Sequence, residues 1–159
     1  MINSITEPII LSLLPISELR GGIPLAVYKG ISIHYAYFIC VIANWFVIPL
    51  SFIFLDNFHV FLMENRFYSK LFNKYIRLKR TSIEKYIGSK WQYFALILLV
   101  GIPLPITGAY TGTLLAWFFE VSRKKAYLAL TIGIMISGLI VSMVIYFSIR
   151  NLNIFIINI

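Results

Sequence analysis

Charged residues are scarce in this sequence, and acidic ones are the scarcest. Only 13% of the 159 residues are charged, whereas 60% are hydrophobic. A chain of this size with so little polar surface cannot cover a water-soluble globule. The composition therefore excludes an ordinary soluble domain and predicts an integral membrane protein.

Cysteine and histidine are almost absent: the chain has one cysteine, Cys40, and two histidines. A single cysteine excludes an internal disulfide, and no Cys/His spacing typical of a metal site occurs. The sequence has no nucleophile elbow, no phosphate-binding loop and no histidine pair for acid-base chemistry. We therefore expect no catalytic residues, no metal, no cofactor and no enzyme activity. A lipid-modifying enzyme that uses Glu18 or Asp56 is the alternative.

The six acidic residues are outnumbered by fourteen basic ones. The excess is concentrated in residues 64–90, which contain Arg66, Lys70, Lys74, Arg77, Lys79, Arg80, Lys85 and Lys90. Basic segments between membrane spans stay on the cytoplasmic side and lie against the headgroups. The sequence predicts a cytoplasmic linker here, and no nucleic-acid partner.

Proline and glycine are few, but they gather inside two apolar runs. GIPLPITGAYTG, residues 101–112, lies within the run 93–119, and PISELRGGIP, residues 15–24, interrupts the run 5–28. Proline removes a helix donor and glycine loosens the backbone. A bilayer tolerates a broken helix only where protein buries it or a wet cavity adjoins it. Both runs are predicted to be broken helices at a site, with Glu18 and Arg20 inside the first break.

Two further apolar runs are unbroken and long enough to cross a bilayer: 31–55, extending to residue 63, and 126–149. If the broken run 93–119 also crossed, the basic linker and the cluster 123–125 would lie on opposite faces, against the charge bias. A hairpin that enters and leaves from the cytoplasm keeps both clusters on one side.

The first broken run is likewise followed by a full helix, so the chain consists of two copies of one unit. One crossing per unit places the copies in opposite orientations, with the hairpin tips facing each other near the midplane. The predicted fold is an all-α integral membrane protein of two inverted repeats, each a re-entrant helical hairpin followed by a transmembrane helix. The boundaries are 1–63 for the first repeat, 64–90 for the linker, 91–150 for the second repeat and 151–159 for the tail.

The two hairpin tips form the predicted substrate site. Broken helices present free N–H groups and positive dipole ends, which suit an anionic headgroup, and Arg20 adds bidentate recognition. Glu18 is the predicted proton carrier, because a carboxylate removed from water is more readily protonated, and Glu120 is a second candidate. The predicted substrate-binding residues are Glu18, Arg20, Gly21, Gly22, Pro24, Pro103, Pro105, Thr107, Gly108, Tyr110, Thr111 and Gly112.

Several of these residues also have a purely structural interpretation. Glu18 and Arg20 would pair with each other and seal the hairpin. Gly108 and Gly112 have the small-xxx-small spacing that lets helices pack closely. Glu120 and Arg123 would serve as an interfacial cap and anchor. Asn44 would bond across helices or to a hairpin.

ELRGGIPLA at 18–26 and PLPITGAYTGTLLA at 103–116 resemble the two signature stretches of the small multidrug export proteins. These prokaryotic membrane proteins are regarded as distant relatives of the DedA, or VTT (SNARE-associated), superfamily. The chain has Ile106 where the family pattern has Gly, and Tyr110 where it has Trp. The resemblance covers most of the chain and implies facing re-entrant hairpins and a role in transport. DedA relatives further imply movement of phosphorylated lipids or lipid carriers, driven by the proton-motive force.

The sequence thus predicts a membrane transporter that moves an anionic or amphipathic substrate, foremost a phosphorylated lipid or lipid carrier, with proton coupling. The alternatives are a small-molecule or multidrug exporter and a non-transporting scaffold or assembly factor. Expected partners are membrane lipids, the substrate and further copies of the chain, because one protomer encloses little interior. The predicted location is the plasma membrane of a prokaryote, with several passes and a cytoplasmic linker.

Overall fold

The computed structural model describes residues 2–63, 90–104 and 107–157, and every regular element among them is an α-helix. The helices are α1 (Ile2–Leu13), α2 (Glu18–Tyr28), α3 (Ile33–Trp45), α4 (Val47–Met63), α6 (Lys90–Gly101), α7 (Ala109–Phe118) and α8 (Arg123–Ile157). Most of the predicted linker, Pro105 and Ile106 lie outside the described residues. The prediction of an all-helical chain is confirmed.

The first break is shorter than the sequence predicts. It covers only residues 14–17, so Glu18 and Arg20 lie in the first turn of α2 instead of inside the break. Pro15 has no N–H for the carbonyl of Leu11, and the Ser17 hydroxyl donates to that carbonyl at 2.5 Å. The helix then resumes, because the Glu18 N–H donates to the carbonyl of Leu14 at 3.0 Å.

α3 and α4 follow each other almost without interruption and form the first long apolar helix. Residues 33–58 are long and apolar enough to cross a membrane. The short interruption at Phe46 was not predicted from the sequence. It lies one turn before Pro49, which has no N–H to offer the carbonyl of Trp45.

α8 is the second helix that is long and apolar enough to cross a membrane, over residues 123–151. It begins earlier than the predicted span 126–149 and continues past Arg150 to Ile157. The prediction of two long apolar helices is therefore confirmed, with different ends.

α6 and α7 form the second broken pair, separated by residues 102–108. The Thr107 hydroxyl lies 3.1 Å from the carbonyls of both Ile102 and Leu104, and so supplies a donor where the broken backbone lacks one. Gly108 immediately precedes α7, and Gly112 lies within it.

Close packing at glycines joins α6, α7 and α8. An added Cβ would lie 2.5 Å from Val100 Cγ2 at Gly112, and 2.7 Å from Val100 Cβ at Gly133. Val100 on α6 is therefore enclosed between backbone segments of α7 and α8. The core extends from here to the buried Ile23 of α2 and Ile48 of α4.

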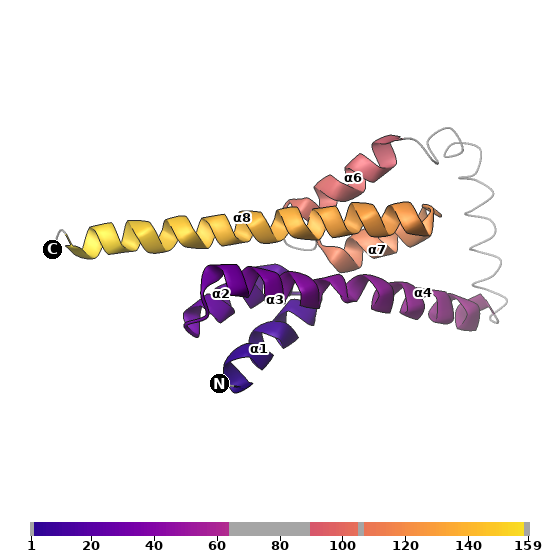
Figure 1. Cartoon of the computed structure of the whole chain (residues 1–159). Coiled ribbons are helices and arrows are strands. Elements are labelled where there is room, and N and C mark those ends of the chain that lie inside the picture. The colour runs from indigo at the N-terminus through magenta and orange to yellow at the C-terminus, as the bar shows by residue number, and fades with distance from the viewer. Residues whose placement is uncertain (1, 64–89, 105–106, 158–159) are drawn as a thin grey trace.

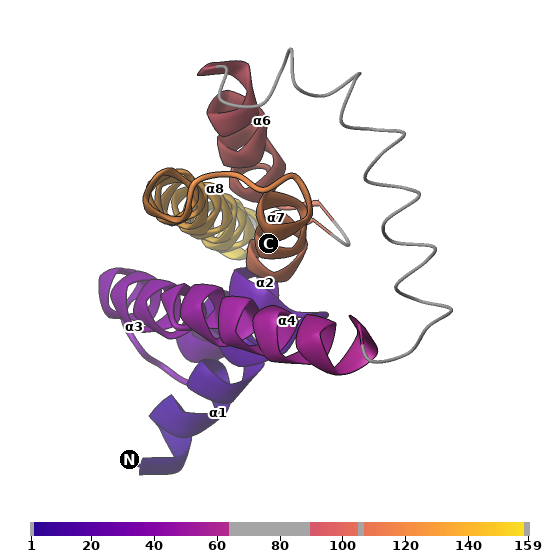
Figure 2. The same ribbon diagram turned by 90° about the vertical axis from the view of Figure 1, so that its right-hand side faces the viewer.

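The two pairs of helices that flank a break, α1–α2 and α6–α7, open toward opposite ends of the molecule (Figure 1). The start of α1 and the end of α2 lie on the left, on the same side as the C-terminus. The start of α6 and the end of α7 lie on the right, where α4 ends and α8 begins. The breaks of both pairs lie in the middle, and Figure 2 shows α2 and α7 next to each other there.

The turns that follow α2 and α7 have the same hydrogen bonds at a spacing of ninety residues. Each turn contains a residue with positive φ, Gly30 (84°) in the first and Glu120 (53°) in the second. In the first turn the backbone N–H groups of residues 29, 30, 31 and 36 donate to the carbonyls of residues 25, 27, 26 and 32. In the second turn those of residues 119, 120, 121 and 126 donate to the carbonyls of residues 115, 117, 116 and 122.

The α6–α8 contact predicts different effects for two glycine substitutions. Gly133→Ala is expected to lower the free energy of unfolding by about 1–3 kcal/mol, because the new methyl group would overlap Val100 Cβ, which cannot rotate away. Gly101→Ala is the matched control, since its nearest neighbour lies 3.4 Å from the added Cβ. Thermal unfolding in detergent measures both. Equal stability of the two variants would contradict the packing described here.

Candidate functional site

Glu18 is a buried carboxylate at the start of α2. The residue is only 7% exposed. Its φ of 44° lies in the left-handed region, which costs a non-glycine residue roughly 1–2 kcal/mol. Strained backbone of this kind persists only where the surroundings hold it, and it is concentrated at functional sites.

The Glu18 carboxylate contacts the start of α7, ninety-one residues away. The backbone N–H of Ala109 donates to Glu18 Oε2 at 3.3 Å. Gly108, the residue before it, has no room for a side chain, because an added Cβ would overlap the Glu18 carboxylate. This negative charge therefore lies at the positive end of the α7 dipole and accepts a bond from one of its free N–H groups.

A second bond joins the same two helix breaks. The Tyr110 hydroxyl donates to the carbonyl of Leu13, at the end of α1, at 2.5 Å. Leu13 is the last residue before the first break, so its carbonyl has no helical donor of its own. Each break thus supplies a partner for a polar group that the other break leaves without a helical bond.

Asn44 on α3 completes the surroundings of Glu18. Its side chain is 1% exposed and is a hydrogen-bond partner of the Glu18 carboxylate. Sequence reasoning noted Asn44 as able to bond to a hairpin but did not include it in the site. An amide side chain within a long apolar run was the available signal.

Arg20 is partly buried and lies on the same turn of α2 as Glu18. The ion pairs of the described residues do not include Glu18 with Arg20. The Arg20 charge acts on the Glu18 carboxylate without forming an ion pair with it, so the structural alternative, in which the two charges seal the hairpin, stays a prediction. The Arg20 guanidinium makes no hydrogen bond to the described part of the chain.

The other predicted tip residues have varied surroundings. An added Cβ at Gly21 would meet Ser17 and Leu11, and one at Gly22 would meet Ser12 and the Pro8 carbonyl, so these two glycines allow α1 and α2 to pack. Gly112 has the same role toward α6. Pro24, Pro103 and Thr111 are partly buried, and Pro105 lies outside the described residues.

Glu120 is not brought to Glu18. It is exposed and lies beyond the far end of α7. A ten-residue helix is about 15 Å long, so the two carboxylates lie at opposite ends of it.

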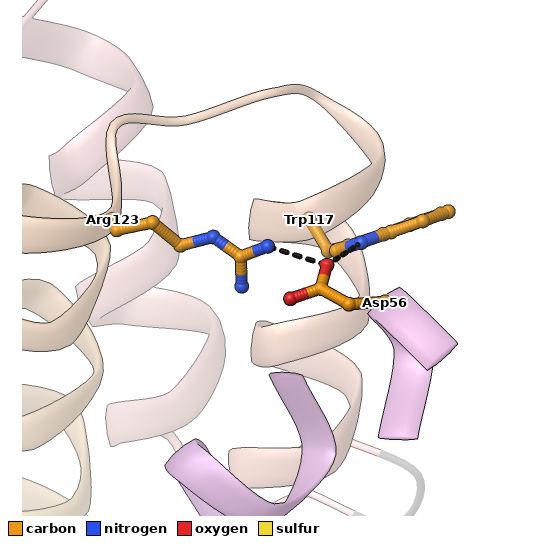
Figure 3. Close-up of polar contacts among 3 residues, drawn as sticks. All are labelled: Asp56, Trp117 and Arg123. Carbon is orange, nitrogen blue, oxygen red and sulfur yellow. Dashed lines mark hydrogen bonds and ion pairs between the residues drawn. The ribbon is translucent and has the colours of Figure 1, made fainter. Parts of the chain in front are cut away.

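Asp56, Trp117 and Arg123 form a second polar cluster that sequence reasoning missed (Figure 3). Asp56 Oδ1 accepts from Trp117 Nε1 at 2.9 Å and from the Arg123 guanidinium at 2.6 Å. The guanidinium also lies 4.2 Å from the centre of the Phe52 ring. The cluster ties α4 to the end of α7 and the start of α8. The available signal was one carboxylate near the end of a long apolar run.

The contact between Glu18 and Gly108 predicts energetic coupling between these residues. Gly108→Ala is expected to destabilise the protein in the wild-type background, because its methyl group displaces the carboxylate. The same substitution in a Glu18→Ala background is expected to cost less, with a coupling of about 0.5–3 kcal/mol. Thermal unfolding of the wild type, the two single variants and the double variant measures this coupling energy. Strictly additive effects of the two substitutions would contradict the contact.

Comparison with known proteins supplies the family. No curated protein and no solved structure matches the chain. A family model described as "Putative small multi-drug export protein" matches residues 18–140, which include α2, the first long apolar helix, the second break and the first half of α8. The match begins at Glu18 itself. The family and the two long apolar helices together indicate a membrane protein. The chain belongs to the small multi-drug export protein family.

Proposed function

We propose that this protein is a proton-coupled membrane exporter of small amphipathic molecules, whose transport site lies where the two helix breaks meet. The observation that carries the proposal is the buried Glu18 carboxylate held by the backbone of α7. The family description favours small-molecule export, the alternative in the sequence analysis, over its first prediction, a phosphorylated lipid or lipid carrier.

The proposed architecture is a pair of inverted repeats, each consisting of a re-entrant hairpin and a spanning helix. The matched hydrogen bonds at a spacing of ninety residues support a repeated unit. The opposite directions in which α1–α2 and α6–α7 open support the inversion (Figure 1). Transporters built in this way hold their ligand at the repeat interface, near broken helices.

Protonation of Glu18 provides the proposed coupling. The ionised carboxylate balances the dipole of α7 and holds the first N–H groups of that helix. A protonated carboxyl is neutral and holds them less strongly. Proton binding therefore loosens the contact between the two breaks, which frees one repeat to move against the other while substrate enters or leaves.

We also propose that the protein works as a homodimer or larger oligomer. Both breaks carry exposed apolar side chains: Leu14 and Ile16 in the first, Ile102 and Leu104 in the second. The backbone at a break has unpaired polar groups, which are costly to expose to lipid. A second copy that covers these segments would remove that cost.

The coupling is tested with Glu18→Gln in proteoliposomes that contain ethidium, a fluorescent amphipathic cation, and carry an imposed pH gradient. Wild-type protein is expected to move the dye with the gradient, and Glu18→Gln is expected to fall to the level of protein-free vesicles. Glu120→Gln is the matched control, because this carboxylate is exposed and far from the breaks.

Normal gradient-driven transport by Glu18→Gln would overturn the proposed coupling. A labelled phospholipid in the same vesicles separates the two substrate classes. If that lipid crosses between leaflets while ethidium stays in place, the small-molecule proposal is wrong.

The topology is tested by labelling single cysteines with a membrane-impermeant thiol reagent, in a Cys40→Ser background. Thr6→Cys, in the first half of α1, and Ser32→Cys, after α2, are expected to react from one face. Lys90→Cys and Lys124→Cys, before and after the second hairpin, are expected to react from the other. Reaction of positions 90 and 124 from opposite faces would mean that α6 and α7 cross the membrane, and the inverted repeat would fail.

A further inference from the structure

The buried side-chain oxygen of Asn44 accepts no hydrogen bond from the described residues. The residue is 1% exposed, and its Oδ1 atom has no hydrogen-bond partner among the residues that the structure describes. A buried acceptor left unpaired is costly, and such groups are rare in folded proteins. The oxygen therefore needs an explanation that its packing alone does not provide.

The other half of the Asn44 amide has a partner, the Glu18 carboxylate. An ionised carboxylate can only accept hydrogen bonds, so it must bond the NH₂ group of Asn44. The backbone N–H groups of Ala109 and Tyr110 also donate hydrogen bonds to this carboxylate. In this state the amide nitrogen is satisfied and the amide oxygen is not.

Protonation of Glu18 turns its carboxyl group from a pure hydrogen-bond acceptor into a donor as well. The protonated carboxyl carries one O–H group, which needs an acceptor. The groups that face Glu18 are Arg20 on its own helix, Tyr110 and the backbone N–H groups on α7, and Asn44 on α3. Guanidinium and backbone N–H groups only donate. The Tyr110 hydroxyl donates to Leu13 and could still accept, but the Asn44 amide is the side chain that already hydrogen-bonds the Glu18 carboxylate. The Asn44 oxygen is the acceptor without a donor.

We propose that Asn44 is a positioning residue for proton binding, and that its amide donates to the ionised Glu18 and accepts from the protonated one. The inference rests on the proposed proton coupling and extends it to a second residue. No covalent bond other than the O–H bond on Glu18 forms or breaks. The amide gives the carboxyl a hydrogen bond in both states, so the proton can stay in a site that excludes water.

The first test uses wild-type protein in nanodiscs and needs no Asn44 variant. Infrared difference spectra between high and low pH are recorded with ¹³C-labelled asparagine. Protonation of Glu18 is expected to shift an asparagine side-chain carbonyl band, and the shift is expected to vanish in Glu18→Gln. If no asparagine band depends on Glu18, the inference is wrong.

The second test measures the pH at which half of Glu18 reacts with a hydrophobic carbodiimide, which modifies protonated carboxyls, by mass spectrometry of the full chain. Asn44→Leu keeps the branched shape of the side chain, with a larger volume, and removes both donor and acceptor. Hydrogen bonds to a charged group are stronger than those to a neutral one, so the ionised form loses more. The half-labelling pH is expected to rise by about one unit, a tenfold change in proton affinity.

Ser51→Ala is the matched control, because Ser51 Oγ on α4 is another buried polar atom for which the described part of the chain provides no hydrogen-bond partner. It is expected to leave the half-labelling pH unchanged. An unchanged value in folded Asn44→Leu protein would overturn the inference, whereas the dye assay of Glu18→Gln decides the proposed function separately. If Asn44→Leu does not fold, the infrared measurement on wild-type protein decides.

Discussion

The bond from the Ala109 N–H to the Glu18 carboxylate is the contact on which the rest of this structure depends. A broken helix in an apolar medium exposes free N–H groups at one end, and a buried carboxylate needs donors. Each group alone would be costly, and together they satisfy each other across ninety-one residues. The two halves of the chain are therefore joined in the middle by these polar groups. Away from the middle, apolar packing joins them together with single polar bonds, such as the one from Trp45 Nε1 to Thr131 Oγ1.

The packing around this contact leaves little freedom. Gly108 gives the carboxylate the space that any side chain would occupy, and Gly22 does the same for Ser12 between α1 and α2. Glu18 reaches its position only with a positive φ. The proposed proton coupling rests on this carboxylate, which a few polar partners hold in a strained conformation.

The outer ends of the two broken pairs are held in different ways. Lys29 and Glu7 form an ion pair within the first pair and the turn that follows it. Arg123 and Trp117 instead bond Asp56 of α4, so the second pair is tied to the helix that follows the first. Ion pairs as exposed as these contribute little stability by themselves. Their value is geometric, since they define where each pair ends against its neighbour.

The sequence by itself determined the helical class, the two long apolar helices and the approximate positions of both breaks, and it drew attention to Glu18. Local chemistry decides these features: proline lacks an N–H, apolar runs have a length, and an isolated charge in such a run is conspicuous. Only the tertiary structure decided that Glu18 bonds α7 instead of Arg20, that Asn44 lies beside it, and that Asp56 bonds Trp117 and Arg123. These contacts join residues far apart in the chain, and no local pattern specifies which distant group meets which.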